Sequence, residues 1–311
     1  MKSMTTKGTT MKTFRYAPLL LCLCVGQALA DTPINLQHAA TPTARISIGN
    51  ISGEVRVTAW DRPVVQVSGQ LGDGAKPLAI TGSDDKLAIE VQPQGGGGGW
   101  LNWGGDNHMG PTLLDLHVPR GATLDVRVVS APLTVDGMNG GMISVNTVSG
   151  RARINANSPS LDIQSVSGNI ELAGHAAQAD LQTVSGDILA PVLGDQAKLQ
   201  TVSGRIQATG GPWRQFSLST VSGDVQVNGA LAPSGKLGID SMSGNVQLQL
   251  PAGTNATVHA SSFSGDLRSD AGSVQKSDHG PGSKLDATLG NGAGTINIET
   301  FSGDLRIRTS N

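Results

Sequence analysis

Two aspartates occupy the same place in copies of a short motif, and paired carboxylates can cleave glycosidic bonds. Asp187 follows the letters VSG at residues 184–186, Asp224 follows VSG at 221–223, and Arg205 follows the copy between them. If the copies stack as parallel coils, the two aspartates stand two coils apart, about 9–10 Å from backbone to backbone. That separation suits an inverting glycoside hydrolase. A polysaccharide-active enzyme is therefore one hypothesis, although no tryptophan or histidine occupies the neighbouring repeat positions.

A second group of residues that could contact a ligand or a partner lies in the glycine-rich stretch GGGGGWLNWGGDNHMG at residues 95–110. Its tryptophans, Trp100 and Trp103, stand close to Asp106 and His108. Large amphipathic rings on a loop can stack on a sugar or anchor a protein partner. The same rings could instead cover an open end of the fold. The sequence leaves both interpretations open.

Other chemistry finds little support in the sequence. The histidines are scattered without the short spacing of a metal pair, and the glycine-rich stretch lacks the Lys-Ser/Thr ending of a phosphate loop. We therefore expect neither a metal site nor a cofactor, and we predict a protein that is not an enzyme.

A repeated turn governs the organisation of the chain. Ser-Gly pairs recur at intervals of 18, 18, 18, 19, 21, 21 and 38 residues from Gly150 onward, with an earlier copy at Gly53 and a degenerate one at Ala131. The fifth residue before each glycine and the second residue after it are apolar almost throughout. Apolar residues step by two on each side of the turn, which is the period of a strand. The corner glycines are Gly53, Gly150, Gly168, Gly186, Gly204, Gly223, Gly244, Gly265 and Gly303.

These units predict an all-β fold, a β-solenoid resembling a parallel β-helix with coils of roughly 18–21 residues. Glycine at the corner is expected to adopt a positive φ. Ladders of Gln164, Gln182 and Gln200 could stack amide on amide on the outer surface, or could form ordinary solvated surface with modest cross-strand pairing. Antiparallel strands should cap both ends, including a hairpin within LAITGSDDKLAIEV at residues 78–91 and another that turns at Asn291 and Gly292.

One position conflicts with simple alternation. The second residue before the glycine is apolar, as in Val184 and Val202, whereas alternation from the buried fifth position places the hydroxyl residue, Thr183 or Thr201, inside. We therefore expect a bulge or an early corner at this point.

The first thirty residues have the character of a secretory signal peptide. Lys12 and Arg15 precede an apolar run, and Ala28–Ala30 offer small residues for cleavage before Asp31. Both cysteines, Cys22 and Cys24, lie within this segment, so the mature chain has no thiol. It carries 18 basic and 24 acidic residues, a net charge of −6 that argues against nucleic-acid binding. We expect export to the periplasm, the cell surface or the medium, and no transmembrane segment after cleavage.

Four segments are predicted: a signal peptide at 1–30, N-terminal strands with the Gly/Trp loop at 31–120, repeats at 121–270, and an insertion with a last repeat at 271–311. The turns VSGD and FSGDL, the segment VPRGATLDVRVVSA at 118–131 and the ending TINIETFSGDLRIR resemble the bacterial putative-adhesin family, a β-strand-repeat domain of unknown function. The resemblance implies an exported β-solenoid and transfers no catalytic residue.

The expected function is that of a non-enzymatic envelope scaffold, adhesin-like protein or binding protein. Its partner would be a polysaccharide or a protein of the cell envelope. The alternatives are the polysaccharide-active enzyme and an accessory component of envelope-stress signalling.

Overall fold

The computed structural model describes residues 32–94, 109–276 and 281–310 of the chain. These ranges contain strands and turns and no helix, so the predicted all-β class is confirmed. The predicted signal peptide and the Gly/Trp loop with Trp100, Trp103, Asp106 and His108 lie outside the described residues.

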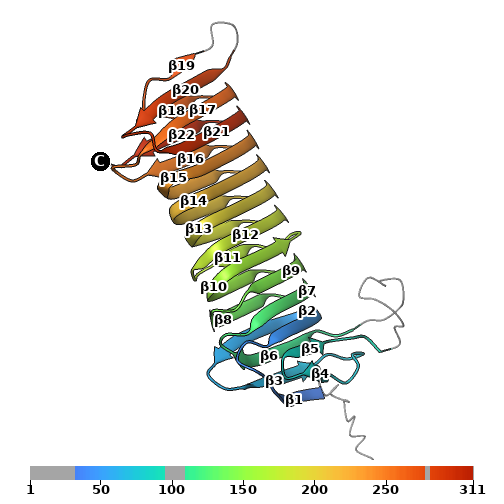
Figure 1. The fold of residues 1–311 in the computed structure, drawn as a ribbon. Helices are drawn as coiled ribbons and strands as arrows, with labels where there is room; N and C mark the ends of the chain where they lie inside the picture. The colour runs from blue at the N-terminus through green and yellow to red at the C-terminus, as the bar shows by residue number, and fades with distance from the viewer. Residues whose placement is uncertain (1–31, 95–108, 277–280, 311) are drawn as a thin grey trace, which may run out of the picture. The chain divides into compact units, whose positions relative to one another are not determined.

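Four long strands form the centre of the repeat region: β12 (Ala176–Ser185), β13 (Ile188–Ser203), β14 (Ile206–Ser222) and β15 (Val225–Ser243). Each pairs in parallel with the next, so that Leu181, Leu199, Leu218 and Ile239 lie in one register. Figure 1 shows these strands side by side, coil upon coil. Every repeat thus hydrogen-bonds to its neighbour along its own length.

The preceding coils follow the same pattern. Their strands also pair in parallel, and the turn at Gly150 lies beside the degenerate copy at Ala131. They comprise β7 (Thr123–Ser130), β8 (Leu133–Asn139), β9 (Ile143–Ser149), β10 (Ala152–Ser165) and β11 (Ile170–Leu172).

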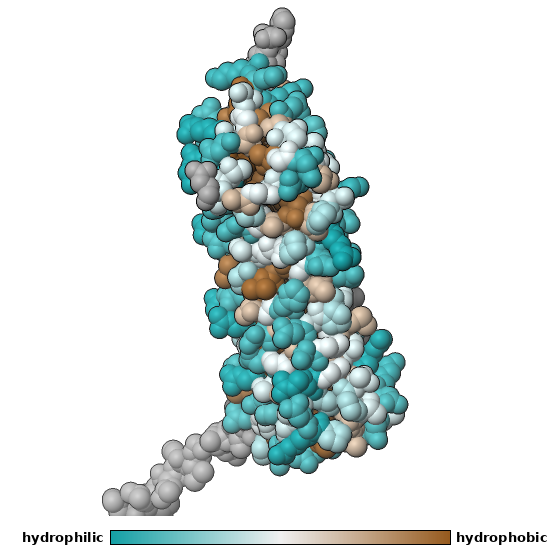
Figure 2. Space-filling view, turned by 60° about the vertical axis from the view of Figure 1, so that its left-hand side comes forward, coloured by the Kyte–Doolittle hydropathy of each residue, from teal (hydrophilic) through white to brown (hydrophobic). Residues whose placement is uncertain are grey.

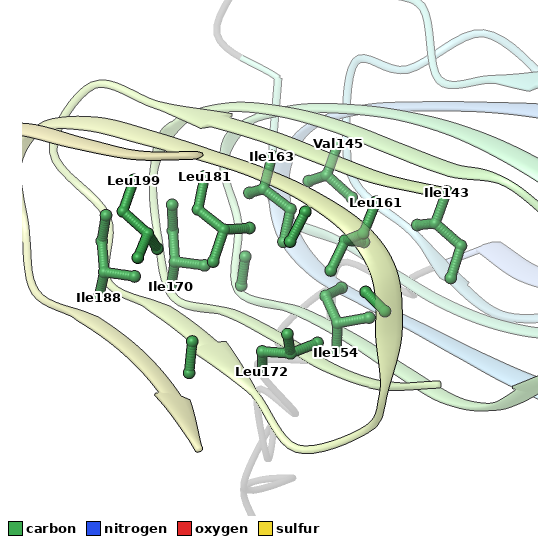
Figure 3. Close-up of a cluster of buried hydrophobic side chains, with 14 of the residues drawn as sticks. Ile143, Val145, Ile154, Leu161, Ile163, Ile170, Leu172, Leu181, Ile188 and Leu199 are labelled. Atoms are coloured by element: carbon green, nitrogen blue, oxygen red, sulfur yellow. The ribbon is translucent and has the colours of Figure 1, made fainter. Parts of the chain in front are cut away.

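The apolar positions before and after the corner fill the interior of the coils. Val145, Ile163, Leu181 and Leu199 follow one another on successive strands, and Figure 3 shows this row facing Ile154, Leu172 and Ile188 from the other side of the corner. All seven side chains are at most 1 % exposed. Because each coil contributes equivalent residues, burial of one coil's apolar side depends on the coil beside it.

The N-terminal end departs from sequential stacking. The strand that carries the first repeat, β2 (Arg45–Trp60), pairs with β7 and β8 on one side and with β5 and β6 on the other. β4 and β5 form the predicted antiparallel hairpin, and β1, β3 and β6 add antiparallel pairs beyond it. The bounds are β1 (Thr32–Ala39), β3 (Val64–Leu71), β4 (Ile80–Ser83), β5 (Lys86–Glu90) and β6 (Thr112–Pro119).

The C-terminal hairpin predicted at Asn291 and Gly292 is wrong. The turn forms, with the Gly292 amide donating to the Leu289 carbonyl at 3.1 Å, but its two strands lie on opposite sides of β17 (Ala256–Ser264). β20 (Ser283–Leu289) pairs with β17 antiparallel, whereas β21 (Gly294–Ser302) pairs in parallel with both β17 and β15. Parallel pairing buries Ile296 and Ile298 of the last repeat between two coils, which a hairpin would not do.

The remaining strands repeat this arrangement on the far side of the corner. β22 (Leu305–Thr309) lies between β16 (Val246–Leu250) and β18 (Leu267–Ser269), and the short β19 (Gln275–Lys276) pairs with β20. The last repeat in the sequence is therefore the penultimate coil of the stack.

The bulge expected before the corner does not occur in the central coils. In β12 the alternation continues unbroken, so that Thr183 is 4 % exposed and Val184 is 48 % exposed. The same holds in the other coils, where the hydroxyl residue is buried and the apolar residue faces outward. In one coil the buried hydroxyl bonds to the corner backbone: the Ser165 hydroxyl accepts the Gly168 N–H at 2.8 Å. The buried hydroxyls of Thr201, Thr220, Ser241 and Thr300 have no hydrogen-bond partner among the described residues.

The corner glycines are required by close approach more than by backbone conformation. A positive φ is present at Gly53 (112°) and Gly150 (123°), but Gly168, Gly186 and Gly223 do without one. At every corner glycine, however, an added Cβ would lie less than 3.0 Å from a backbone carbonyl oxygen of the neighbouring coil. The expectation that these positions share a positive φ is corrected accordingly.

Replacing Gly186 by alanine should therefore lower the thermal midpoint by several degrees, because overpacking against a backbone typically costs about 1–3 kcal/mol. Gly238 provides the matched control, since an added Cβ there meets nothing within 4 Å. Gly238→Ala should leave the midpoint unchanged or raise it slightly. Equal midpoints for the two variants in calorimetry would contradict the close-approach explanation.

Candidate functional site

A row of exposed apolar side chains runs across the coils beside the corners. Its members are the residues two before each corner glycine from Gly150 onward, and each is between 37 and 58 % exposed. Strand register places them on successive coils, so they form one line, which we call the apolar ladder: Val148, Val166, Val184, Val202, Val221, Met242, Phe301 and Phe263.

The ladder changes in size along its length. It begins with five valines and ends with Met242 and two phenylalanines. Phe301 and Phe263 stack with ring centroids 4.9 Å apart and an interplanar angle of 9°. Before Val148 the register continues to Val129 and Ile51, which are more buried. The side chains at one end of the ladder are therefore small or partly buried, and those at the other end are large and exposed.

A polar ladder runs parallel to the apolar one, two residues earlier on each strand. Its central members, including Gln164, Gln182 and Gln200, are uncharged. In register order it comprises Glu90, Gly49, Arg127, Asn146, Gln164, Gln182, Gln200, Ser219, Asp240, Glu299, Ser261 and Lys284.

The glutamines do not bond to one another as expected. The Gln182 amide donates to Asp180 Oδ1 at 2.9 Å, and the Gln164 amide donates to Asp162 Oδ1 at 3.4 Å. Each amide is thus held by a carboxylate on its own strand, which fixes its orientation beside the apolar ladder.

The two ladders line one continuous groove with a volume of about 2510 Å³. At one end it reaches Lys76, Pro93 and Met109, and at the other it reaches Pro281 and Lys284. Figure 2 shows one face of the molecule, on which hydrophobic residues form patches among neutral and hydrophilic ones. A contiguous apolar strip on a protein surface marks an interaction site more often than it marks ordinary surface.

At several corners the residue after the glycine has a structural role. Asp187 Oδ1 accepts the backbone N–H of Arg205 at 2.8 Å, and Asp224 Oδ1 accepts that of Asn245 at 3.3 Å. Asn245 and Asp304 accept backbone N–H groups of neighbouring coils in the same way. These side chains therefore link successive corners.

This arrangement leaves Asp187 and Asp224 without a common site. Asp187 and Arg205 border a hollow of about 140 Å³ that does not include Asp224. Pockets that enclose a small ligand usually measure about 300–1,000 Å³. Neither this hollow nor the groove, as the described residues form them, contains both carboxylates.

No cluster of three or more His, Cys, Asp or Glu side chains suited to a metal occurs within residues 32–94, 109–276 and 281–310. Away from the groove, the Arg120 guanidinium donates two hydrogen bonds of 2.8 and 3.1 Å to the Asp61 carboxylate. This bonding lowers the pKa of the exposed Asp61 carboxyl. The described part of the chain also holds no helix long and apolar enough to cross a membrane.

Sequence reasoning thus missed the apolar ladder. The signal was present, because an apolar residue recurs at a position that alternation assigns to the outside. It was interpreted as a backbone irregularity, whereas the structure keeps the alternation and exposes the residue.

If the ladder serves contact and not folding, Val184→Thr together with Val202→Thr should shift the thermal midpoint by less than about 2 °C. Threonine retains the β-branched shape, and surface substitutions usually change stability by at most about 0.5 kcal/mol. Leu181→Ala should instead cost about 2–5 kcal/mol, because Leu181 is fully buried. A comparable loss in the double threonine variant would show that the valines support the core.

Comparison with known proteins gives the family and little beyond it. No curated protein matches the chain. Among solved structures, a putative adhesin from Bacteroides fragilis NCTC 9343 is 14 % identical over 90 % of this chain and 98 % of its own, with a TM-score of 0.42.

Two proteins of Parabacteroides distasonis ATCC 8503 are similarly distant. A putative adhesin is 12 % identical over 89 % of this chain and 97 % of its own, with a TM-score of 0.42. A putative lipid binding protein is 12 % identical over 88 % and 96 %, with a TM-score of 0.36. TM-scores below 0.5 leave the function of this chain to be argued from its own residues.

The family comparison is more decisive. The sequence pattern of the family described as Toastrack DUF4097 matches residues 43–308, which span most of the chain and all of the repeated turns. This confirms the resemblance suggested by those turns. The chain belongs to the Toastrack DUF4097 family.

Proposed function

We propose that this chain is an exported, non-enzymatic scaffold or binding protein of the cell envelope, built as a β-solenoid that binds through its apolar ladder. The ladder is the single observation that carries the proposal. Eight apolar side chains are exposed on consecutive coils, beside the polar ladder in which the Gln164 and Gln182 amides bond to carboxylates.

Strand formation alone does not account for the ladder. Threonine would satisfy a half-exposed strand position as well as valine does, and it occurs at the buried position next to it in Thr183 and Thr201. Fully burying a valine, methionine or phenylalanine gains about 1.5–3 kcal/mol. Covering the ladder with a partner would therefore gain free energy that the exposed side chains do not contribute to folding, which favours a binding function.

The polysaccharide-active alternative has weaker support, since Asp187 and Asp224 act as links between corners and share no pocket. A turnover assay on envelope and plant glycans should detect no product with the natural chain. Turnover that is lost in both Asp187→Asn and Asp224→Asn would overturn the non-enzymatic proposal.

Export gives a separate prediction. The protein recovered from the envelope or the medium should begin at Asp31, as the Ala28–Ala30 cleavage site indicates. Intact-mass measurement checks this. A mass that retains Cys22 or Cys24 would contradict the predicted cleavage.

Contact through the ladder can be tested in cells without knowing the partner. A photo-crosslinking phenylalanine analogue placed at position 184 should form adducts of increased mass in the envelope fraction. The same analogue at Leu189, which is 42 % exposed and lies off the groove, is the matched control. Adducts at 184 and not at 189 are expected whatever the partner is, whereas equal labelling at both positions would argue against the ladder as the contact surface.

A further inference from the structure

We infer that the partner of the apolar ladder is a second copy of this chain, packed ladder against ladder with the two stacks antiparallel. This inference rests on the proposed function, because it names the partner of the same surface. Three properties of the groove support it: its spacing, its change in side-chain size and its distribution of charge.

Spacing favours a partner with the same repeat. Ladder residues follow one another at the inter-strand distance of about 4.8 Å. An extended peptide laid along the groove would present side chains on one face at about 6.8 Å intervals and would lose register within a few coils. The peptide backbone would also find no unpaired strand to hydrogen-bond to, since the strands that line the groove are paired on both sides. A second copy matches the spacing at every coil.

Side-chain size selects an antiparallel arrangement. With a two-fold axis between the coils of Val184 and Val202, Val184 of each copy faces Val202 of the other. Moving outward, the larger side chains of one copy meet the smaller or more buried ones of the other. Thus Met242 faces Val148, Phe301 faces Val129, and Phe263 faces Ile51. The end of each ladder with small or partly buried side chains accommodates the bulky end of its partner.

Charge in the polar ladder selects the same register. Counting outward from the two-fold axis, Gln182 faces Gln200, Gln164 faces Ser219, and Asn146 faces Asp240. Beyond these, Arg127 faces Glu299 and Glu90 faces Lys284. Both charged pairs are of opposite sign, and all of these residues line the groove.

A parallel pairing of the two copies would oppose like charges instead of opposite ones. It would place Arg127 against Arg127, Glu299 against Glu299 and Lys284 against Lys284, and it would bring the stacked phenylalanines of both copies together. Like charges directly opposed across a sheet destabilise it. The antiparallel dimer is also isologous, so that each contact occurs twice and the assembly closes.

The strength of the contact follows from its size. Twelve positions at about 4.8 Å give a strip about 50 Å long, and two rows of side chains make it about 10 Å wide. The two copies together would bury on the order of 1,000 Å², the lower end of specific interfaces. A dimer that forms at micromolar concentration is therefore expected.

Sedimentation equilibrium of the mature chain measures the association. The natural chain should dimerise, and Arg127→Glu or Glu299→Lys alone should weaken the dimer at least tenfold by opposing like charges. The double variant should regain most of the affinity, because each new glutamate then faces a new lysine. A parallel dimer would be insensitive to this exchange, since both single variants merely replace one like pair by another.

Cross-linking reports the register directly, because the mature chain has no cysteine of its own. Chains with Gln164→Cys and chains with Ser219→Cys should be joined by a short bis-maleimide only when mixed. Linkage of either variant to itself would overturn the antiparallel register. A chain that stays monomeric at submillimolar concentration would overturn the second copy as partner.

Failure of the dimer inference can be distinguished from failure of the proposed function. A monomer whose position 184 still forms adducts with another protein or a lipid would contradict this inference and retain the ladder as a binding surface. A monomer without such adducts would contradict both.

Discussion

The close approach of backbones at the corners is the constraint on which the structure depends. At each corner glycine the neighbouring coil's carbonyl oxygen occupies the space that a Cβ would need. This contact fixes where each coil turns, and parallel pairing then carries the register along the whole strand. Asp187 and Asp224 strengthen the same junction by accepting N–H groups from the next coil. Identical corners thus keep equivalent residues aligned from coil to coil.

Alignment converts a residue preference at one position into a continuous surface. The buried row through Leu181 and Leu199 becomes a core, and the row through Val184 and Val202 becomes the apolar ladder. Because the strand period is two, Thr183, between Leu181 and Val184, faces inward, where its hydroxyl donates to the Gly168 carbonyl at 3.4 Å. The buried hydroxyl residues next to the corners and the exposed apolar ladder are therefore two consequences of one alternation.

Much of this could be predicted from the sequence. The spacing of Ser-Gly pairs gave the coils, and the apolar residues on each side of the corner gave the core. The order of the last coils could not be predicted, because Asn291 and Gly292 favour a tight turn whether the next strand pairs beside the previous one or crosses to the far side of β17. The ladder was visible at Val184 and its equivalents, but the usual burial of valine argued for a bulge. The structure instead keeps the alternation and buries the hydroxyl residue.

The central claim is that the ladder valines face solvent in the isolated chain and become covered on association. Methyl NMR of the mature chain with a soluble paramagnetic probe tests it most directly. In dilute solution the methyl signals of Val166, Val184, Val202 and Val221 should broaden while those of Leu181 and Leu199 stay sharp, and the valine signals should become protected as the protein concentration rises. Valine methyls that remain sharp at every dilution would contradict the claim, because they would then lie inside the coils.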